Sequence, residues 1–583
     1  MERRLLLAIV LSALVLFLFQ AYYGTPPGPP PVAGNQSPIV ANASPGAPAV
    51  APAATPAVVP PPAPTATLSV GDTEERDVTV ETQKVRVVFT NRGARLRHWV
   101  LKEYRDDRGE LLDLVPAAIP PDVPLPFSLR VEDAQTTSTL NQSLYRVAGT
   151  QDMRIDGSAQ PASIAFEMET ADGLKARKTF DFEPASFIVQ FSASVQQAGQ
   201  PLNPTVEWGP GLGDEIARAQ QGSFLRPSYL YSAQAIFHVD GSVERVASAK
   251  IGQALTRDGV FRWGGVDDHY FISALLQPAG PAHLEYHQVV IPDTTTNPPQ
   301  AAHYVSYAVR LAAPPEKARF YVGPKQLDIM RGIDPEFTRA IYFGMFAFLA
   351  APLLDGLKWV HGFVGSWGWS IIVLTILINL AMFPLRHMSV VSMRRMQEIQ
   401  PQMKAIQDRY AQYKITDPER QKMNTEVMEL YKTHGVNPAS GCVPMLLTLP
   451  FLFAFYAMLG QAIEIRGEGF LGWITDLSRA DPLYITPVLM GLTMFWQQKI
   501  TPTSADPNQQ KMMMMMPLVV TTTMIFAPAG LVIYWLVSNV WGIGQQYLTS
   551  YLIGQKKGTG AKPGGTKPHD IIVPPTSERR QKG

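Results

Sequence analysis

The stretch that decides the fold is Trp367–Arg386, which reads WGWSIIVLTILINLAMFPLR. No charged residue precedes Arg386 in it, and the uncharged run extends back to Gly362. A helix of about 20 apolar residues is long enough to cross the roughly 30 Å hydrocarbon core of a bilayer. Residues 362–385 are therefore predicted to form a membrane-spanning helix.

Four more runs of the same character follow, and none of them contains Asp, Glu, Lys or Arg. They are residues 443–463, 482–498, 512–528 and 530–554. Charged residues make up only 17% of the whole chain, below the roughly 25% of soluble domains, which agrees with a large lipid-facing surface. We predict a membrane α-helical bundle with a core of five helices over 362–554.

The N-terminus is predicted to add a sixth span. Arg3 and Arg4 precede the apolar run Leu5–Phe19, an arrangement typical of a signal sequence or a membrane anchor. Bulky residues stand where a cleavage site would need small ones, so we predict an uncleaved anchor over 1–23. Residues 24–67, rich in Pro and Ala, are predicted to be an extended linker.

Residues 68–325 alternate apolar and polar side chains with a period of two. Examples are Val85, Val87 and Phe89, then Val305, Tyr307 and Val309. Such runs, separated by turn residues, predict an all-β sandwich, which would lie on the outer, periplasmic side. The histidines of this segment lack the spacing of metal ligands, and the single cysteine, Cys442, excludes an internal disulfide. We expect no metal, no cofactor and no catalytic residue.

The segment 326–361 links the β domain to the bundle. Its apolar residues recur at helical spacing, and charged residues lie on both sides of them. We predict one amphipathic helix lying on the outer membrane surface. The residues assigned to its apolar face are Phe337, Ile341, Met345 and Phe348.

The distribution of basic residues predicts the topology. Lys and Arg are concentrated in 386–440 and in the tail 555–583, whereas the loop 464–481 carries more acidic residues. Both basic segments are therefore predicted to be cytoplasmic, and with them both termini of a multi-pass protein. Apolar residues spaced three and four apart in 386–440 favour an antiparallel coiled-coil hairpin over a plain spacer.

Polar residues inside the five runs are neutral, which bears on function. Thr375, Asn379, Met382 and Arg386 recur at helical spacing and share one face, so a neutral polar stripe ends in a positive charge. Ion-coupled transport needs an ionisable residue in the membrane, which makes a channel or transporter the weaker alternative. A second alternative is that Thr375 and Asn379 only bond to neighbouring helices.

Four segments of the chain together resemble the YidC family of membrane protein insertases. They are LKWVHGFVGSWGWSIIVLTILINLAMFP (357–384), VNPASGCVPMLLTLPFLFAFYAML (436–459), DPLYITPVLMGLTMFWQQKITPT (481–503) and GLVIYWLVSNVWGIGQQ (530–546). The order of anchor, Pro-rich linker and β domain resembles the Gram-negative form. The resemblance implies a location in the bacterial inner membrane and a function as insertase or chaperone, without enzymatic activity.

The family resemblance also implies a polar groove, open to cytoplasm and lipid, that receives the polar tail of an incoming protein. Its residues here would be Thr375, Asn379, Arg386, Thr448, Gln498 and Ser538. Tyr534 and Trp535 match an aromatic pair beside which substrate helices slide, and bundle packing is their alternative role. Where the family usually has a groove arginine, this chain has Asn379, and we expect Arg386 to supply a weaker attraction at the groove's mouth.

The implied partners are nascent membrane proteins, the Sec translocon and membrane lipids. The hairpin and the basic tail are also candidates for contact with the ribosome, because basic segments attract RNA and anionic headgroups alike. A solvated tail without a partner is the alternative. Whether the protein inserts helices alone or holds them for the translocon is left open by the sequence.

Overall fold

The structure is a computed structural model. It describes residues 68–106, 108–116, 119–120, 123–148, 153–210, 212, 231, 233–252, 254–293, 300–413, 417–435, 443–501 and 507–558. The predicted anchor 1–23, the linker up to residue 67 and the tail beyond residue 558 lie outside these ranges. By its contacts the chain forms two units, and residues 399–435 belong to a different unit from the β strands and the remaining helices.

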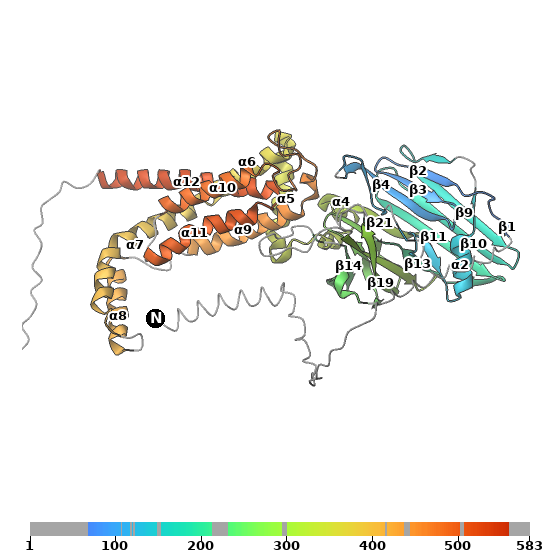
Figure 1. The fold of residues 1–583 in the computed structure, drawn as a ribbon, viewed down its shortest axis with the longest axis horizontal. Helices are drawn as coiled ribbons and strands as arrows, with labels where there is room; N and C mark the ends of the chain where they lie inside the picture. Colours follow the sequence, from blue (N-terminus) through green and yellow to red (C-terminus); the bar gives the residue numbers. More distant parts are fainter. Residues whose placement is uncertain are drawn as a thin grey trace, which may run out of the picture. The chain divides into compact units, whose positions relative to one another are not determined.

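Residues 68–324 form three β-sheets (Figure 1). The largest has eleven strands: β1 (Leu68–Val70), β7 (Arg146–Ala148), β9 (Ala162–Thr170), β10 (Leu174–Phe182), β11 (Ile188–Gln197), β12 (Gln200–Leu202), β14 (Gln234–Val239), β15 (Ser242–Ala247), β17 (Phe261–Asp267), β18 (Phe271–Leu276) and β21 (Ala318–Pro324). The main path runs β1-β9-β10-β11-β21-β18-β17-β14-β15, with β7 on β9 and β12 on β11.

Two smaller sheets have five strands each. One has the order β16 (Leu255–Gly259), β19 (Ala282–Asp293), β20 (Gln300–Leu311), β13 (Thr205–Trp208), β6 (Ser128–Arg130). The other has the order β5 (Leu111–Asp113), β4 (Arg95–Arg105), β3 (Val85–Thr90), β2 (Asp77–Glu81), β8 (Arg154–Asp156). The described pairings are antiparallel except β2 with β8, and a helix, α2 (Ala134–Gln142), follows β6.

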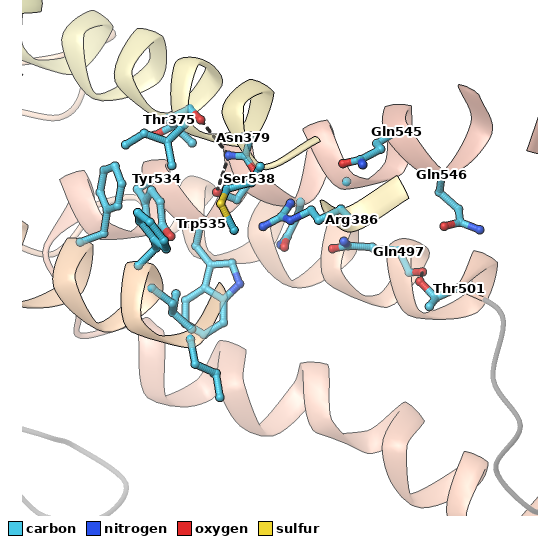
Figure 2. A pocket seen from close by; sticks show the side chains of 18 of the residues that line it. Thr375, Asn379, Arg386, Gln497, Thr501, Tyr534, Trp535, Ser538, Gln545 and Gln546 are labelled. Carbon is cyan, nitrogen blue, oxygen red and sulfur yellow. Dashed lines mark hydrogen bonds between the residues drawn. The ribbon is translucent and has the colours of Figure 1, made fainter. Parts of the chain in front are cut away.

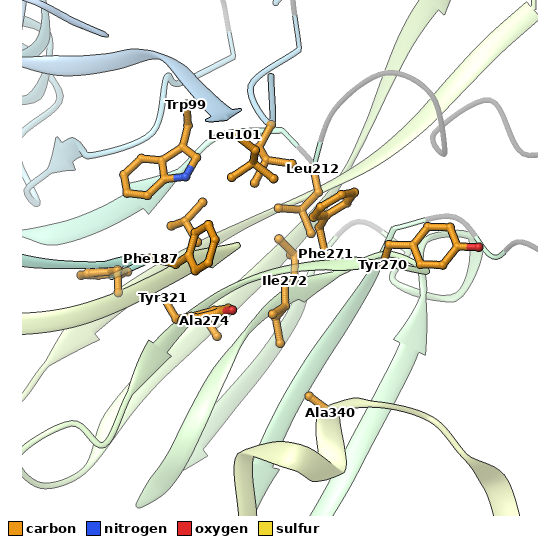
Figure 3. Close-up of a cluster of buried hydrophobic side chains, with 14 of the residues drawn as sticks. Trp99, Leu101, Phe187, Leu212, Tyr270, Phe271, Ile272, Ala274, Tyr321 and Ala340 are labelled. Atoms are coloured by element: carbon orange, nitrogen blue, oxygen red, sulfur yellow. The ribbon is translucent and has the colours of Figure 1, made fainter. Parts of the chain in front are cut away.

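The alternation read from the sequence corresponds to these strands. In β3 the side chains of Val85, Val87 and Phe89 are buried, and the residues between them are more exposed. Figure 3 shows Trp99 and Leu101 of β4 clustered with Phe187, with Tyr321 of β21 and with side chains of β18. Aromatic and aliphatic burial between the strands therefore holds the domain together. The β-sheet structure predicted for this segment is confirmed, and its packing as a sandwich stays a prediction.

The segment after the β domain is not one amphipathic helix, so that prediction is wrong. It contains α4 (Leu327–Ile333), two 3₁₀ turns (Pro335–Ala340 and Gly344–Phe346) and α5 (Ala347–Val364). The break comes at Asp334, whose backbone is extended (φ −162°, ψ 124°), because a residue before proline avoids the helical region.

Phe337 explains why the break is tolerated. Its ring lies 5.4 Å from that of Trp263 and 5.3 Å from that of Tyr321, and the side chain is fully buried. It therefore belongs to the β-domain core, whereas Phe348 in α5 is 70% exposed. Helical spacing had placed both residues on one face, but they lie in different environments.

The C-terminal region is helical, as predicted. Its helices are α6 (Trp367–Ala381), α7 (Phe383–Arg409), α9 (Val443–Gln461), α10 (Ile485–Ile500), α11 (Pro507–Met524) and α12 (Ala529–Gly558). Met382 separates α6 from α7, just before Pro384, which has no N–H to donate. In the described residues no helix alone is long and apolar enough for a span, whereas Gly344–Val364 with Trp367–Ala381, bent by 119°, qualifies as a pair.

The described residues of the smaller unit are 399–413 and 417–435. It contains the end of α7 and α8 (Pro418–Thr433), whose first turn is capped by the Asp417 carboxylate accepting from Glu419 N at 3.0 Å. Glu426 of α8 accepts from Arg409 and from the Tyr410 hydroxyl, both at 2.8 Å. These bonds join the two helices, and the coiled-coil packing of the segment stays a prediction.

Candidate functional site

Five helices of the C-terminal region surround a cavity of about 350 Å³ (Figure 2). Its lining residues come from α6, α7, α9, α10 and α12. Those with polar side chains are Thr375, Asn379, Arg386, Gln497, Thr501, Tyr534, Ser538, Asn539, Gln545 and Gln546, with Trp535 beside them. Apart from the tyrosine, Arg386 is the one ionisable side chain among the residues that line the cavity in the described structure.

Thr375 and Asn379 of α6 lie on the cavity wall. The Thr375 hydroxyl donates to Ile371 O at 2.6 Å, and the Asn379 amide nitrogen donates to Thr375 O at 2.8 Å. Asn379 Nδ2 also lies 3.5 Å from Ser538 Oγ on α12. The Asn379 amide oxygen is buried and has no hydrogen-bond partner among the described residues, so this wall keeps an acceptor unused.

Arg386 stands in the first turn of α7 and lines the same cavity as Asn379. Figure 2 shows its side chain between those of Asn379 and Gln497. No described residue forms an ion pair or hydrogen bond with its guanidinium. A half-buried, unpaired guanidinium has a strong electrostatic preference for an anionic group. The positive charge of Arg386, predicted to lie at the mouth of the groove, thus lines the cavity.

The helix α12 contributes polar side chains that the predicted site did not include. Gln545 donates from Nε2 to Phe383 O at 3.2 Å, beside the break between α6 and α7, and its buried Oε1 has no described partner. Asn539 donates to Met490 O at 3.3 Å and lies 3.4 Å from Thr493 Oγ1. Gln545 follows Ser538 by seven residues, a helical spacing that could have identified it.

Gln497 of α10 and Thr501, which follows the last residue of that helix, line the cavity, and the prediction did not include them. Gln498, which it did include, is half-buried and is not among the described lining residues. The difference follows from helical phase, because adjacent residues point about 100° apart. Thr448 lies in α9, and its side chain is outside the described part of the structure.

The aromatic pair lies in the cavity wall as well. Tyr534 is buried, and its ring stacks on Phe455 of α9 with centroids 4.3 Å apart and planes inclined by 9°. Trp535 is partly buried and also lines the cavity. Tyr534 therefore packs α12 against α9 and also faces the cavity, so the geometry accommodates both roles considered for it.

Two family models match the chain. Residues 359–556 match the 60Kd inner membrane protein family, and residues 77–355 match the YidC periplasmic domain. The boundary between the two matches lies near the end of α5. The β domain and the helical region thus each have a counterpart in one family.

Curated relatives match over nearly the whole length. A membrane protein insertase YidC from Geobacter metallireducens is 32% identical, with 94% of this chain and 98% of the relative covered. One from Oleidesulfovibrio alaskensis is 33% identical at the same coverages. The crystal structure of an active YidC insertase with its first transmembrane domain resolved aligns with 84% of this chain and 95% of its own, at 14% identity and a TM-score of 0.34. From the sequence matches, this chain belongs to the YidC family of membrane protein insertases.

Proposed function

We propose that this protein inserts hydrophobic segments of nascent proteins into the bacterial inner membrane, using the cavity as a transient polar groove. Its relatives are membrane protein insertases of the inner membrane, which act without being enzymes. The observation that carries the proposal is the cavity lining. It combines neutral polar side chains with two amide oxygens and one guanidinium that have no hydrogen-bond or ion-pair partner among the described residues.

A groove of this composition lowers the free-energy cost of moving the polar tail of a substrate into the membrane. Burying an amide or hydroxyl without a hydrogen bond costs roughly 2–7 kcal/mol, and every peptide unit of an extended tail carries such groups. The unpartnered oxygens of Asn379 and Gln545 can accept from the N–H groups of a tail. The aromatic side chains beside them offer an apolar surface for the hydrophobic part of the same substrate.

Arg386 would attract acidic groups of the tail. At the level of Asn379 the wall is neutral, and the guanidinium stands seven residues further along the chain, in the next helix. We propose that an acidic tail is attracted by Arg386 and is then solvated by amides and hydroxyls. Dependence on acidic residues should therefore be weaker than with a charge at position 379.

The topology belongs to the same proposal. The uncharged helices and the N-terminal anchor would make six spans, with both termini cytoplasmic and the β domain periplasmic. Part of the predicted interfacial helix remains in α5, where Phe348, Trp359 and Phe363 are more than 60% exposed. Large exposed aromatic residues suit the boundary between headgroups and hydrocarbon. Nascent chains, the Sec translocon, lipids and, through the basic segments, the ribosome are the proposed partners.

Reconstitution tests the proposal directly. The purified full-length protein in liposomes, without a translocon, should insert a small single-spanning substrate, measured by protection of the translocated tail from added protease. Empty liposomes are the control. Failure to insert, or rapid uptake of small solutes instead, would contradict the proposal and favour a chaperone or a channel. Adding the translocon to the same vesicles shows whether the two act together.

A further inference from the structure

Gly542 of α12 and Gln497 of α10 face each other across the lining of the cavity. A side chain at position 542 would place its Cβ less than 3.0 Å from Gln497 Nε2 and 3.2 Å from Gln497 Cδ. The three atoms nearest to that Cβ all belong to Gln497. The two helices can therefore hold this spacing with Gln497 in place only because residue 542 has no side chain.

No described residue holds the Gln497 amide in place through a hydrogen bond. Its side chain forms no hydrogen bond with a described residue, although the backbone carbonyl accepts from Thr501. A long side chain without hydrogen bonds changes rotamer readily. Any group added at position 542 would consequently displace the amide rather than separate the helices. Both residues line the cavity, so the displaced amide can move into it.

We propose that Gly542 is a positioning and specificity-determining residue of the groove. By leaving room for the Gln497 amide against α12, it keeps the cavity wide at Gln497. Its width there sets how large a polar side chain of an incoming tail can be. The proposal rests on the proposed insertase function and goes beyond it by assigning which tails the groove accepts.

The chain provides a matched control in the same helix. Gly544 stands two residues further along, is exposed, and has nothing within 4 Å of an added Cβ. Gly542→Ala and Gly544→Ala therefore make the same change in helix propensity, but only Gly542→Ala displaces Gln497. A third variant, Gly542→Ala with Gln497→Ser, removes the side chain that would be pushed into the cavity.

The experiment compares two substrates that share one hydrophobic segment, one with a Ser/Gly tail and one with a Gln-rich tail. Each variant is reconstituted at full length in liposomes, and insertion is measured by protease protection. We expect Gly542→Ala to insert the Gln-rich tail several-fold more slowly and the Ser/Gly tail at the wild-type rate. Gly544→Ala should match the wild type on both, and the double variant should recover the Gln-rich tail.

Three outcomes of the insertion assay would overturn the inference. Gly542→Ala could insert both tails like the wild type, or lose both without recovery by Gln497→Ser, which is the pattern of a packing defect. The wild type and Gly544→Ala could also insert neither tail, which would refute the proposed function as well.

As an independent readout, a Ser538→Cys reporter in a Cys442→Ser background should react more slowly with a water-soluble maleimide once Gly542→Ala is added. A labelling rate that is unchanged or higher in Gly542→Ala contradicts the inference.

Discussion

The Asn379 amide nitrogen donates to the carbonyl oxygen of Thr375 at 2.8 Å, while the Asn379 amide oxygen has no described partner. The donor side of the amide is therefore used, by its own helix and at 3.5 Å by Ser538 Oγ of α12, and the acceptor side is left over. Asn379 is only 4% exposed. A buried acceptor without a partner is costly, which is reasonable at a site that receives donors from a substrate or from water.

Two substitutions of Asn379 distinguish a polar role of its amide from a packing role of its side chain. We expect Asn379→Leu and Asn379→Ala both to reduce insertion, because each removes the unused acceptor. The measurement is insertion in the liposome assay at equal protein levels. If Asn379→Leu is impaired and Asn379→Ala is as active as the wild type, the amide itself is not needed and bulk at this position is what interferes.

Arg386 should account for whatever dependence on tail charge the protein has. A hydrogen bond to a charged group contributes about 1.5–3 kcal/mol, so Arg386→Ala should slow insertion of acidic tails roughly tenfold or more. Neutral tails should be much less affected, and added salt should reduce the difference. The test uses tails of graded negative charge, with Arg386→Lys as the charge-conserving control. A steep charge dependence that persists in Arg386→Ala would show that the attraction comes from elsewhere.

The buried ion pair of the β domain should be sensitive to loss of one partner. Lys325 Nζ lies 2.9 Å from Asp267 Oδ2, and both side chains are at most 1% exposed. Breaking such a pair costs about 3–5 kcal/mol, because one charge stays buried alone. Lys325→Met should therefore lower the melting temperature of the full-length protein, followed by the β-sheet circular dichroism. Lys325→Met with Asp267→Asn should recover much of the loss, and equal melting of both variants would contradict the assignment.

Asp268 should make the β domain less stable as the pH rises from about 4 to about 7. Burial raises the pKa of this carboxyl to about 7, against hydrogen bonds from Tyr270 N and Phe271 N that lower it. In this window the unfolded chain releases the proton and the folded chain keeps it, so the free energy of unfolding falls with increasing pH.

Asp268→Asn isolates that contribution, because it keeps an oxygen that can accept the same two backbone N–H groups. We expect the variant to gain melting temperature relative to the wild type as the pH rises from 4 to 7, and to keep a constant advantage above it. His269 is present in both Asp268→Asn and the wild type. Its contribution to the pH dependence of stability therefore cancels in the difference between their melting temperatures. A difference independent of pH would mean that Asp268 is ionised throughout.

Much of this protein was predictable from its sequence, because local patterns decide local structure. Uncharged apolar runs predict helices, and period-two alternation predicts strands, as in β3. The helical spacing of Thr375, Asn379 and Arg386 predicts that they share one face, and in the structure all three line one cavity. The sequence can indicate this grouping because the three residues lie in one continuous segment, where their spacing is directly visible.

What only the tertiary structure decided involves contacts between segments. Periodicity states which face of a helix a residue occupies, but not which neighbour that face meets. It could not show that Phe337 packs into the β domain, that Gln497 rather than Gln498 meets the cavity, or that Gln545 bonds to Phe383 O. Room for the Gln497 amide likewise depends on a missing side chain at Gly542, 45 residues later in the chain. Close packing across elements fixes these positions, and no local pattern encodes them.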